Sequence, residues 1–211
     1  NAQFGRDDEG LAIDGKTLRG SFDAASSKSA IHMVSAWATA NSISLGQVVT
    51  DEKSNEITAI PKLLEMLILK GAIVTIDAMG CQTEIARKII AGGGDYILNV
   101  KGNQPTLRDG IEQVFASHLD EMTSPHPVQS SSTERKAHGR KESRWSYVCS
   151  APRNLPDRDR WPSLKAIGMV ISNTTRDGKD CIDVRYYILS KKLSAKSFTA
   201  AVASHWAIEN Q

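Results

Sequence analysis

One short stretch, residues 72–76, constrains the fold of this chain more than any other. Its five residues are almost all apolar and mostly β-branched, which is typical of a strand that is buried on both faces. Such a strand lies inside a sheet that carries helices on both sides. Asp77 follows directly, and a carboxylate in that position costs free energy unless it is paired or bound to a cation.

Hydrophobic periodicity predicts the elements that surround this strand. We expect further strands over residues 11–16, 31–40, 43–50 and 96–100, and helices over residues 55–70, 83–91 and 105–122. The resulting order is three strands, helix, strand, helix, strand, helix. This order predicts an α/β fold in which helices pack against a mixed sheet.

The character of the chain changes after residue 122. Ser, Pro and basic residues dominate up to residue 162, with a short strand expected over 144–149. Two longer strands are expected over 164–172 and 181–189, joined by a hairpin turn. Ser194 is expected to cap a closing helix. We therefore divide the chain into a core (1–122), a β-rich insertion (123–192) and a truncated closing helix of the core (193–211).

Composition excludes several classes of protein. With 40% hydrophobic and 24% charged residues, the chain has the balance of a globular protein with a real core. The net charge of +2 is too small to indicate a partner. The three cysteines are isolated and odd in number, which favours a reducing cytoplasm over a disulfide framework. Neither a signal peptide nor a membrane-spanning run is expected.

Three acids stand in similar surroundings. Asp14 is expected to end the first strand and Asp77 to end the central strand 72–76, and Glu209 lies on the closing helix. If the two strands are neighbours, their carboxylates lie close together, and hard oxygen ligands of this kind suit Mg²⁺ or Mn²⁺. From the sequence around them, these acids are equally compatible with a metal site and with solvent-exposed residues that only stabilise turns or cap helices.

Several basic and amide residues could contact nucleic acid. Lys16 and Arg19 follow Asp14, and Lys101, Asn103 and Gln104 follow the strand beside Asp77; each group is also compatible with an ordinary turn. The basic stretch 133–146 could neutralise phosphates, although its composition alone favours a flexible charged loop.

Five segments, taken in order, carry a family resemblance. They are Ile13-Asp-Gly-Lys-Thr-Leu-Arg-Gly-Ser21, Ile76-Asp-Ala-Met-Gly-Cys-Gln82, Val100-Lys-Gly-Asn-Gln104, His138-Gly-Arg140 and His205-Trp-Ala-Ile-Glu-Asn-Gln211. Together they resemble the DDE transposases of bacterial insertion sequences, in the group that includes the H-repeat-associated proteins. The combination spans almost the whole chain and is far more specific than any single motif.

The resemblance implies a ribonuclease H-like fold with Asp14, Asp77 and Glu209 as catalytic and metal-binding triad. It implies two Mg²⁺ or Mn²⁺ ions that support DNA cleavage and strand transfer. It further implies partners: the double-stranded ends of the mobile element, target DNA and a second copy of the chain in a synaptic homodimer. The residues expected to contact DNA are Lys16, Arg19, Lys101, Asn103, Gln104, His138, Arg140, Lys141 and Arg144.

One departure from the family pattern concerns the closing helix. Many related transposases carry Tyr and Arg seven and four positions before the catalytic Glu, where this chain has Val202 and His205. Two alternative functions stay open at this point. They are a ribonuclease H-like nuclease without strand transfer, and an inactive DNA-binding remnant of a transposase.

Overall fold

The architecture is that of an α/β protein, seen in a computed structural model of the chain. The structure describes residues 9–17, 32–39, 43–50, 56–121, 127–137, 140–176 and 179–209. Arg19 and His138 lie outside these residues. The chain forms two compact units, residues 1–98 with 201–211 and residues 99–200, which we call the first and second units.

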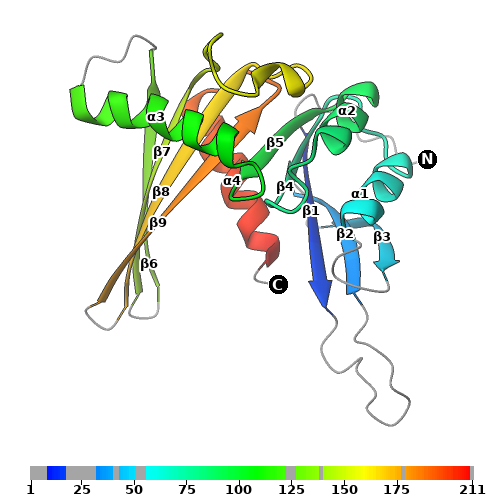
Figure 1. Cartoon of the computed structure of the whole chain (residues 1–211). Helices are drawn as coiled ribbons and strands as arrows, with labels where there is room; N and C mark the ends of the chain where they lie inside the picture. Colours follow the sequence, from blue (N-terminus) through cyan, green and yellow to red (C-terminus); the bar gives the residue numbers. More distant parts are fainter. Residues whose placement is uncertain are drawn as a thin grey trace. The chain divides into compact units, whose positions relative to one another are not determined.

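The first unit is built on a mixed sheet (Figure 1). Its strands are β1 (Glu9–Thr17), β2 (His32–Ala38), β3 (Ile43–Thr50), β4 (Ala72–Ile76) and β5 (Asp95–Val100), of which β5 continues into the second unit. Their order is β3-β2-β1-β4-β5. β1 and β2 pair antiparallel, as do β2 and β3, whereas β4 runs parallel to both β1 and β5. This places the predicted doubly buried strand between two parallel neighbours.

Helices cover both faces of β4 in the first unit. A Cβ on Gly80 would lie 2.2 Å from Ile76 Cγ2 and 3.1 Å from Ile60 Cδ1, so Ile76 faces α1 (Glu56–Glu65). Thr75 contacts His205 of α4 (Ala195–Glu209), whose residues from 201 onward belong to this unit. Because adjacent strand residues point to opposite faces, α1 and the end of α4 lie on opposite sides of β4. The third helix of the first unit is α2 (Thr83–Ala91).

The second unit contains an antiparallel meander. Its strands are β6 (Gln129–Ala137), β7 (Arg140–Ser150), β8 (Ala166–Arg176) and β9 (Lys179–Leu189), in the order β9-β8-β7-β6. A 3-10 turn, η2 (Arg158–Arg160), separates β7 from β8. The helix α3 (Pro105–Glu121) contacts β9 and buries Leu107, Ile111 and Phe115 completely. The start of α4 adds Phe198, whose ring meets Tyr187 edge-on at 5.4 Å.

Most of the predicted elements are confirmed. The order of the first eight elements is the predicted one, and α2 begins and ends where the periodicity places it. Ser194 caps α4, since its Oγ accepts a hydrogen bond from the Ser197 backbone N–H at 3.1 Å. Among the described residues, none of the helices is long and apolar enough to cross a membrane.

The largest differences from the predicted elements are an early helix end, a longer strand and a missed strand. α1 ends at Glu65 instead of residue 70, because Met66 and Leu67 donate to carbonyls only three residues back and the chain turns there. The strand β7 is longer than predicted. The strand β6 was missed, because its Ser-rich and charged sequence resembles a loop; it lies at the edge of the meander, where polar strands are common.

Candidate active site

The first two candidate acids come directly after the last paired residues of two neighbouring strands. These last pairs between β1 and β4 are Ile13 and Ile76, and Asp14 and Asp77 each come one residue later. Neighbouring strands are about 4.8 Å apart. The two acids are therefore close in the backbone of the fold, and both are partly exposed.

One expectation about Asp14 needs correction. It does not end its strand, because β1 continues to Thr17 and pairs Asp14 with Ser35 of β2. The antiparallel partner β2 keeps β1 extended beyond the last residue that β4 reaches. Asp14 thus sits on rigid strand backbone, whereas Asp77 sits just after the end of β4.

The turn after β4 orients Asp77. Its Oδ1 accepts hydrogen bonds from the backbone N–H groups of Met79, at 3.1 Å, and Gly80, at 3.4 Å. This is the local pattern by which Asp side chains stabilise turns. Gly80 is needed because a Cβ there would collide with Ile76. The motif Ile76–Gln82 therefore folds into a turn that fixes the direction of the carboxylate.

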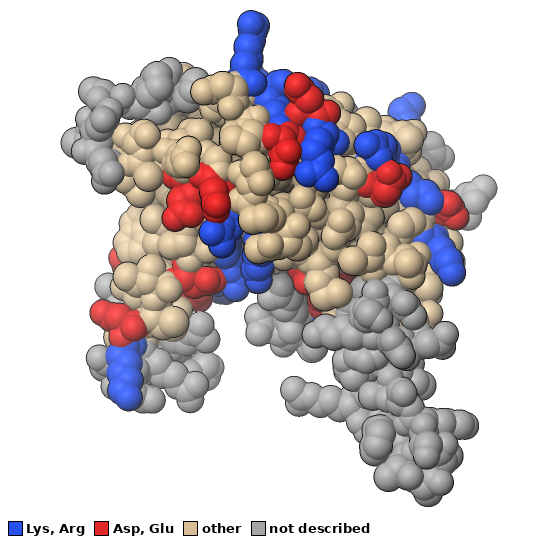
Figure 2. Space-filling view, in the orientation of Figure 1, with Lys and Arg blue, Asp and Glu red and all other residues tan. Residues whose placement is uncertain are grey.

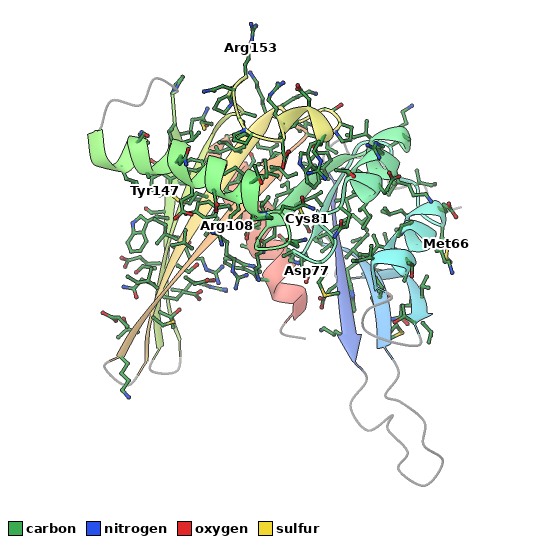
Figure 3. All side chains as sticks on the ribbon, viewed as in Figure 1. Met66, Asp77, Cys81, Arg108, Tyr147 and Arg153 are labelled. Atoms are coloured by element: carbon green, nitrogen blue, oxygen red, sulfur yellow. The ribbon has the colours of Figure 1, made fainter. Side chains whose placement is uncertain are left out.

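A buried thiol lies in the same turn. Cys81 is fully buried, and Figure 3 labels it together with Asp77. Burial raises the pKa of the Cys81 thiol far above its ordinary value, and the negative charge of Asp77 raises it further. Cys81 therefore stays protonated and acts as a packing residue of the turn that carries Asp77.

The third acid lies on α4. Glu209 is the last residue of this helix, and the structure does not describe its side chain. The helix is attached to the sheet one turn earlier, where His205 Nδ1 lies 3.1 Å from Thr75 Oγ1. Thr75 lies in β4, two residues before Asp77. The end of α4 therefore packs on the face of β4 that carries Thr75.

The donor set suits a hard divalent cation. Among the side chains that the structure describes, no three His, Cys, Asp or Glu residues gather as a metal site. The Asp14–Asp77 pair nevertheless offers carboxylate oxygens, which are the ligands that Mg²⁺ and Mn²⁺ prefer. The two N–H groups on Asp77 use only part of the accepting capacity of its carboxylate. The residues present therefore fit the metal that the sequence predicts.

The predicted DNA contacts are spread over both units. Lys16 lies two residues after Asp14 in β1 and so on the same face as Asp14. Lys101 and Asn103 are exposed between β5 and α3, whereas Gln104 is partly buried and precedes α3 directly.

The basic stretch is not the flexible loop that its composition favours. Residues 133–137 and 140–146 form paired strands, β6 and β7. Arg140 and Lys141 lie in β7, with side chains outside the described set. Arg144 forms an ion pair with Glu142, its Nε and an Nη donating at 2.8 and 2.5 Å. Its charge is therefore partly neutralised.

Thr75 was not predicted from the sequence as a residue of the site. It is the one polar residue in the run 72–76, and it is 5% exposed. A buried hydroxyl needs a hydrogen-bond partner, so a Thr inside an otherwise apolar strand predicts a polar contact from the covering helix. His205 was noted only as a departure from the family pattern.

Comparison with known proteins identifies a matching family model and several similar sequences. Residues 5–211 match the model of the family described as "Transposase DDE domain". The chain is 45% identical over 210 residues to the "H repeat-associated putative transposase YhhI" of Escherichia coli K12, covering 97% of this chain and 55% of that protein. It is 49% identical over 151 residues to the "H repeat-associated putative transposase YbfD" of the same strain, covering 72% of this chain and 58% of that protein.

A more distant relative and a solved structure complete the comparison. The "Uncharacterized protein in dhlA 3'region" of Xanthobacter autotrophicus is 38% identical over 180 residues, covering 85% of this chain and 59% of that protein. A sugar N-methyltransferase from Streptoalloteichus aligns with a TM-score of only 0.25 and 14% identity, over 63% of this chain and 46% of the enzyme, and carries no argument. The chain spans little more than half the length of these curated relatives. With the family model matched over nearly its whole length, the chain belongs to the transposase DDE domain family.

Proposed function

We propose that this chain is the catalytic part of a DDE transposase that cuts the ends of an insertion sequence and joins them to target DNA. One observation carries the proposal: Asp14 and Asp77 each come one residue after the last pair of two parallel strands, Ile13 and Ile76, and the end of α4 contacts β4 at Thr75. Membership of the transposase family gives this pair of acids its chemical context.

In this proposal three acids share one task. Asp14 and Asp77 would hold Mg²⁺ or Mn²⁺, and Glu209 would complete the set from α4. The backbone N–H groups of Met79 and Gly80 keep the Asp77 carboxylate in one orientation. When bound, a pair of such ions activates the attacking oxygen and stabilises the leaving oxygen of a phosphodiester.

The proposed reaction has two steps on DNA. In the first, a water oxygen forms a bond to phosphorus and the bond from phosphorus to the 3′ oxygen breaks, which leaves a 3′-hydroxyl and a 5′-phosphate. In the second, that 3′-hydroxyl attacks a phosphodiester of the target, and the target strand gives up its own 3′ oxygen. Neither step needs a covalent bond to the protein.

The remaining parts of the proposal concern fold and partners. We propose a ribonuclease H-like core with residues 123–192 as an insertion, acting in the bacterial cytoplasm. Lys16 and Arg19, which follow Asp14 in the sequence, contact DNA, as do Lys101, Asn103 and Gln104 of the second unit. The basic residues His138, Arg140, Lys141 and Arg144 contact the phosphate backbone more widely. Two copies of the chain hold the two element ends together.

The test is strand transfer with labelled DNA. The chain is incubated with Mg²⁺, a duplex that carries the terminal repeat of its element, and a supercoiled target plasmid. We expect nicking at the repeat and a product in which the labelled 3′ end is joined to the plasmid. Asp77→Asn should abolish both products, since Asn lacks the charge but keeps an oxygen for the turn.

The alternatives give different outcomes in the same experiment. Cleavage without joined product in the wild-type chain would favour a ribonuclease H-like nuclease. Binding of the duplex with neither product would favour an inactive remnant. Asp109→Asn, which changes an exposed aspartate paired with Arg108, is the matched control and should leave both products unchanged.

A further inference from the structure

One hydroxyl in β4 links this strand to two other elements of the first unit, β1 and α4. Thr75 Oγ1 lies 3.1 Å from His205 Nδ1 of α4 and donates to the Leu11 carbonyl oxygen of β1 at 3.5 Å, the long limit for such a bond. Thr75 itself belongs to β4. All three residues are buried, with 5%, 7% and 4% of Thr75, His205 and Leu11 exposed. The contact is therefore shielded from water.

The chemistry of the hydroxyl assigns the protons. A Thr hydroxyl has one proton to donate and two lone pairs that accept. Both contacts are satisfied at once when the hydroxyl donates to Leu11 and accepts from an N–H at His205 Nδ1. In the reverse arrangement, with the hydroxyl donating to His205 Nδ1, the Leu11 carbonyl oxygen would lose this donor.

The three elements joined here are the ones that carry the candidate acids. Leu11 precedes Asp14 by three residues in β1, and Thr75 precedes Asp77 by two. His205 precedes Glu209 by four residues, which is one helical turn, so the two positions lie on the same face of α4. Each of the three contacting residues thus lies within four positions of one of the acids along the chain.

We infer that Thr75 and His205 are positioning residues that hold the end of α4 on the sheet and so set Glu209 opposite Asp14 and Asp77. This inference rests on the proposed function for its catalytic meaning. The burial of His205 agrees with a structural link, because a side chain enclosed between α4 and β4 is not presented to DNA. Glu209 lies at the end of its helix, where the backbone gains least from helical hydrogen bonds. A fixed contact one turn earlier offsets that weakness.

The first experiment needs neither metal nor DNA. Amide hydrogen exchange is measured in the metal-free chain for residues 203–209, with α2 as the internal reference. In Thr75→Val, which keeps the shape but removes the hydroxyl, exchange over 203–209 should be about tenfold faster than in wild type, relative to α2. Thr75→Ser keeps the hydroxyl and should restore slow exchange.

A matched control removes a hydroxyl elsewhere on the same helix. Thr199 Oγ1 donates to the Ala195 carbonyl oxygen within α4, so Thr199→Val should leave exchange over 203–209 unchanged. If Thr75→Val does not fold, His205→Leu replaces it, with His205→Asn as the rescuing variant because Asn places an N–H donor near the position of Nδ1. Equal exchange in wild type and in the hydroxyl-free or His-free variant overturns the link.

The second experiment measures the site itself by isothermal titration with Mn²⁺. Thr75→Val should lower the affinity about tenfold, and Thr75→Ser should bind as wild type does. Unchanged affinity in Thr75→Val would overturn the positioning role. If the wild-type chain binds no Mn²⁺, the proposed function and the catalytic role of this link both fail. The exchange experiment then still decides whether the Thr75–His205 contact fixes the helix.

Discussion

At the scale of single residues, the turn that carries Asp77 depends on a position without a side chain. Gly80 closes this turn against the strand it follows, and a Cβ there would lie 2.2 Å from Ile76 Cγ2. Real Cβ atoms do not approach other atoms so closely, so an alanine would push Ile76 out of its packed position. The carboxylate of Asp77 would move with the turn, because its Oδ1 is bonded to the Gly80 N–H.

We therefore expect Gly80→Ala to lower the free energy of unfolding by about 1–3 kcal/mol, the usual cost of overpacking a core. Denaturant unfolding followed by circular dichroism measures this change. Gly102→Ala is the control, since a Cβ at Gly102 meets no atom within 4 Å. It should change stability by less than about 0.5 kcal/mol. Equal stabilities for the two variants would refute this account of the turn.

The buried thiols make stability depend on alkaline pH. Burial raises the pKa of Cys149 from its ordinary value of 9.0 to about 11. Between these values the unfolded chain loses the thiol proton and the folded chain keeps it, so unfolding becomes easier as pH rises. We expect the Cys149 share of the free energy of unfolding to fall by about 1–3 kcal/mol from pH 9 to 11.

Replacing Cys149 separates its contribution to the pH dependence from that of the other buried groups. Cys149→Ala should lose less stability than wild type over that range, although Cys81 and Tyr96, whose pKa values burial also raises, remain in both proteins. Cys181 is exposed and serves as the control position. Identical pH slopes for Cys149→Ala and wild type would contradict the prediction.

At the scale of elements, α4 is the helix that carries Glu209. It begins in the second unit and ends in the first unit, which contains Asp14 and Asp77. Its start is fixed by Ser194, whose Oγ accepts from the Ser197 N–H at 3.1 Å. An exposed helix start left without such a cap loses about 1 kcal/mol. Ser194→Ala should therefore lower the free energy of unfolding by about that amount.

The matched control is Ser117→Ala in α3. Ser117 is exposed in the interior of its helix and donates to the Gln113 carbonyl oxygen at 2.9 Å, so it caps no free backbone N–H. Alanine favours helix interiors, and this variant should be as stable as wild type or slightly more so. A loss of stability in Ser117→Ala equal to that in Ser194→Ala would show that capping is not the cause.

The elements also show how far the sequence alone determines the fold. Strands and helices with strong periodicity, such as β4 and α2, were predicted with their correct bounds, because their apolar residues have one way to be buried. The strand β6 could not be predicted, since its polar residues are held by pairing with β7 and not by burial. Pairing between distant segments leaves little trace in a local pattern.

The same limit applies to the site. The apolar strands that precede Asp14 and Asp77 were expected to be neighbours, and β1 and β4 do pair in parallel up to Ile13 and Ile76, one residue before each acid. The contact between Thr75 and His205 could not be predicted, because it joins residues 130 positions apart. Sequence patterns identify the acids, but tertiary packing determines what holds them.

At the scale of the whole molecule, charges of opposite sign lie close together at several places among the described residues. Figure 2 shows Lys and Arg interspersed with Asp and Glu on the visible face. Several of these charges form pairs, such as Arg87 with Glu84 and Arg108 with Asp109. DNA binding should therefore depend on individual unpaired cations more than on the net charge of +2.

This predicts unequal effects of two basic residues on DNA affinity. Lys101 is exposed, and among the described residues no carboxylate lies within ion-pair distance of it, whereas Arg144 is paired with Glu142. Lys101→Ala should weaken DNA binding and reduce the slope of log affinity against log salt by about 1. Arg144→Ala should change both quantities less. Fluorescence anisotropy at several salt concentrations measures them, and a larger effect for Arg144→Ala would contradict the prediction.

The central claim is that Asp14 and Asp77 together hold a divalent cation. Isothermal titration of the chain with Mn²⁺ tests it most directly, with Asp77→Asn and Asp109→Asn as the matched pair. The Asp77→Asn variant keeps a side-chain oxygen for the Met79 and Gly80 N–H groups, so the turn should persist while the charge is lost. We predict that wild type and Asp109→Asn bind Mn²⁺ alike and that Asp77→Asn binds at least about tenfold more weakly. Equal binding by Asp77→Asn and wild type, or no binding by wild type, would contradict the account.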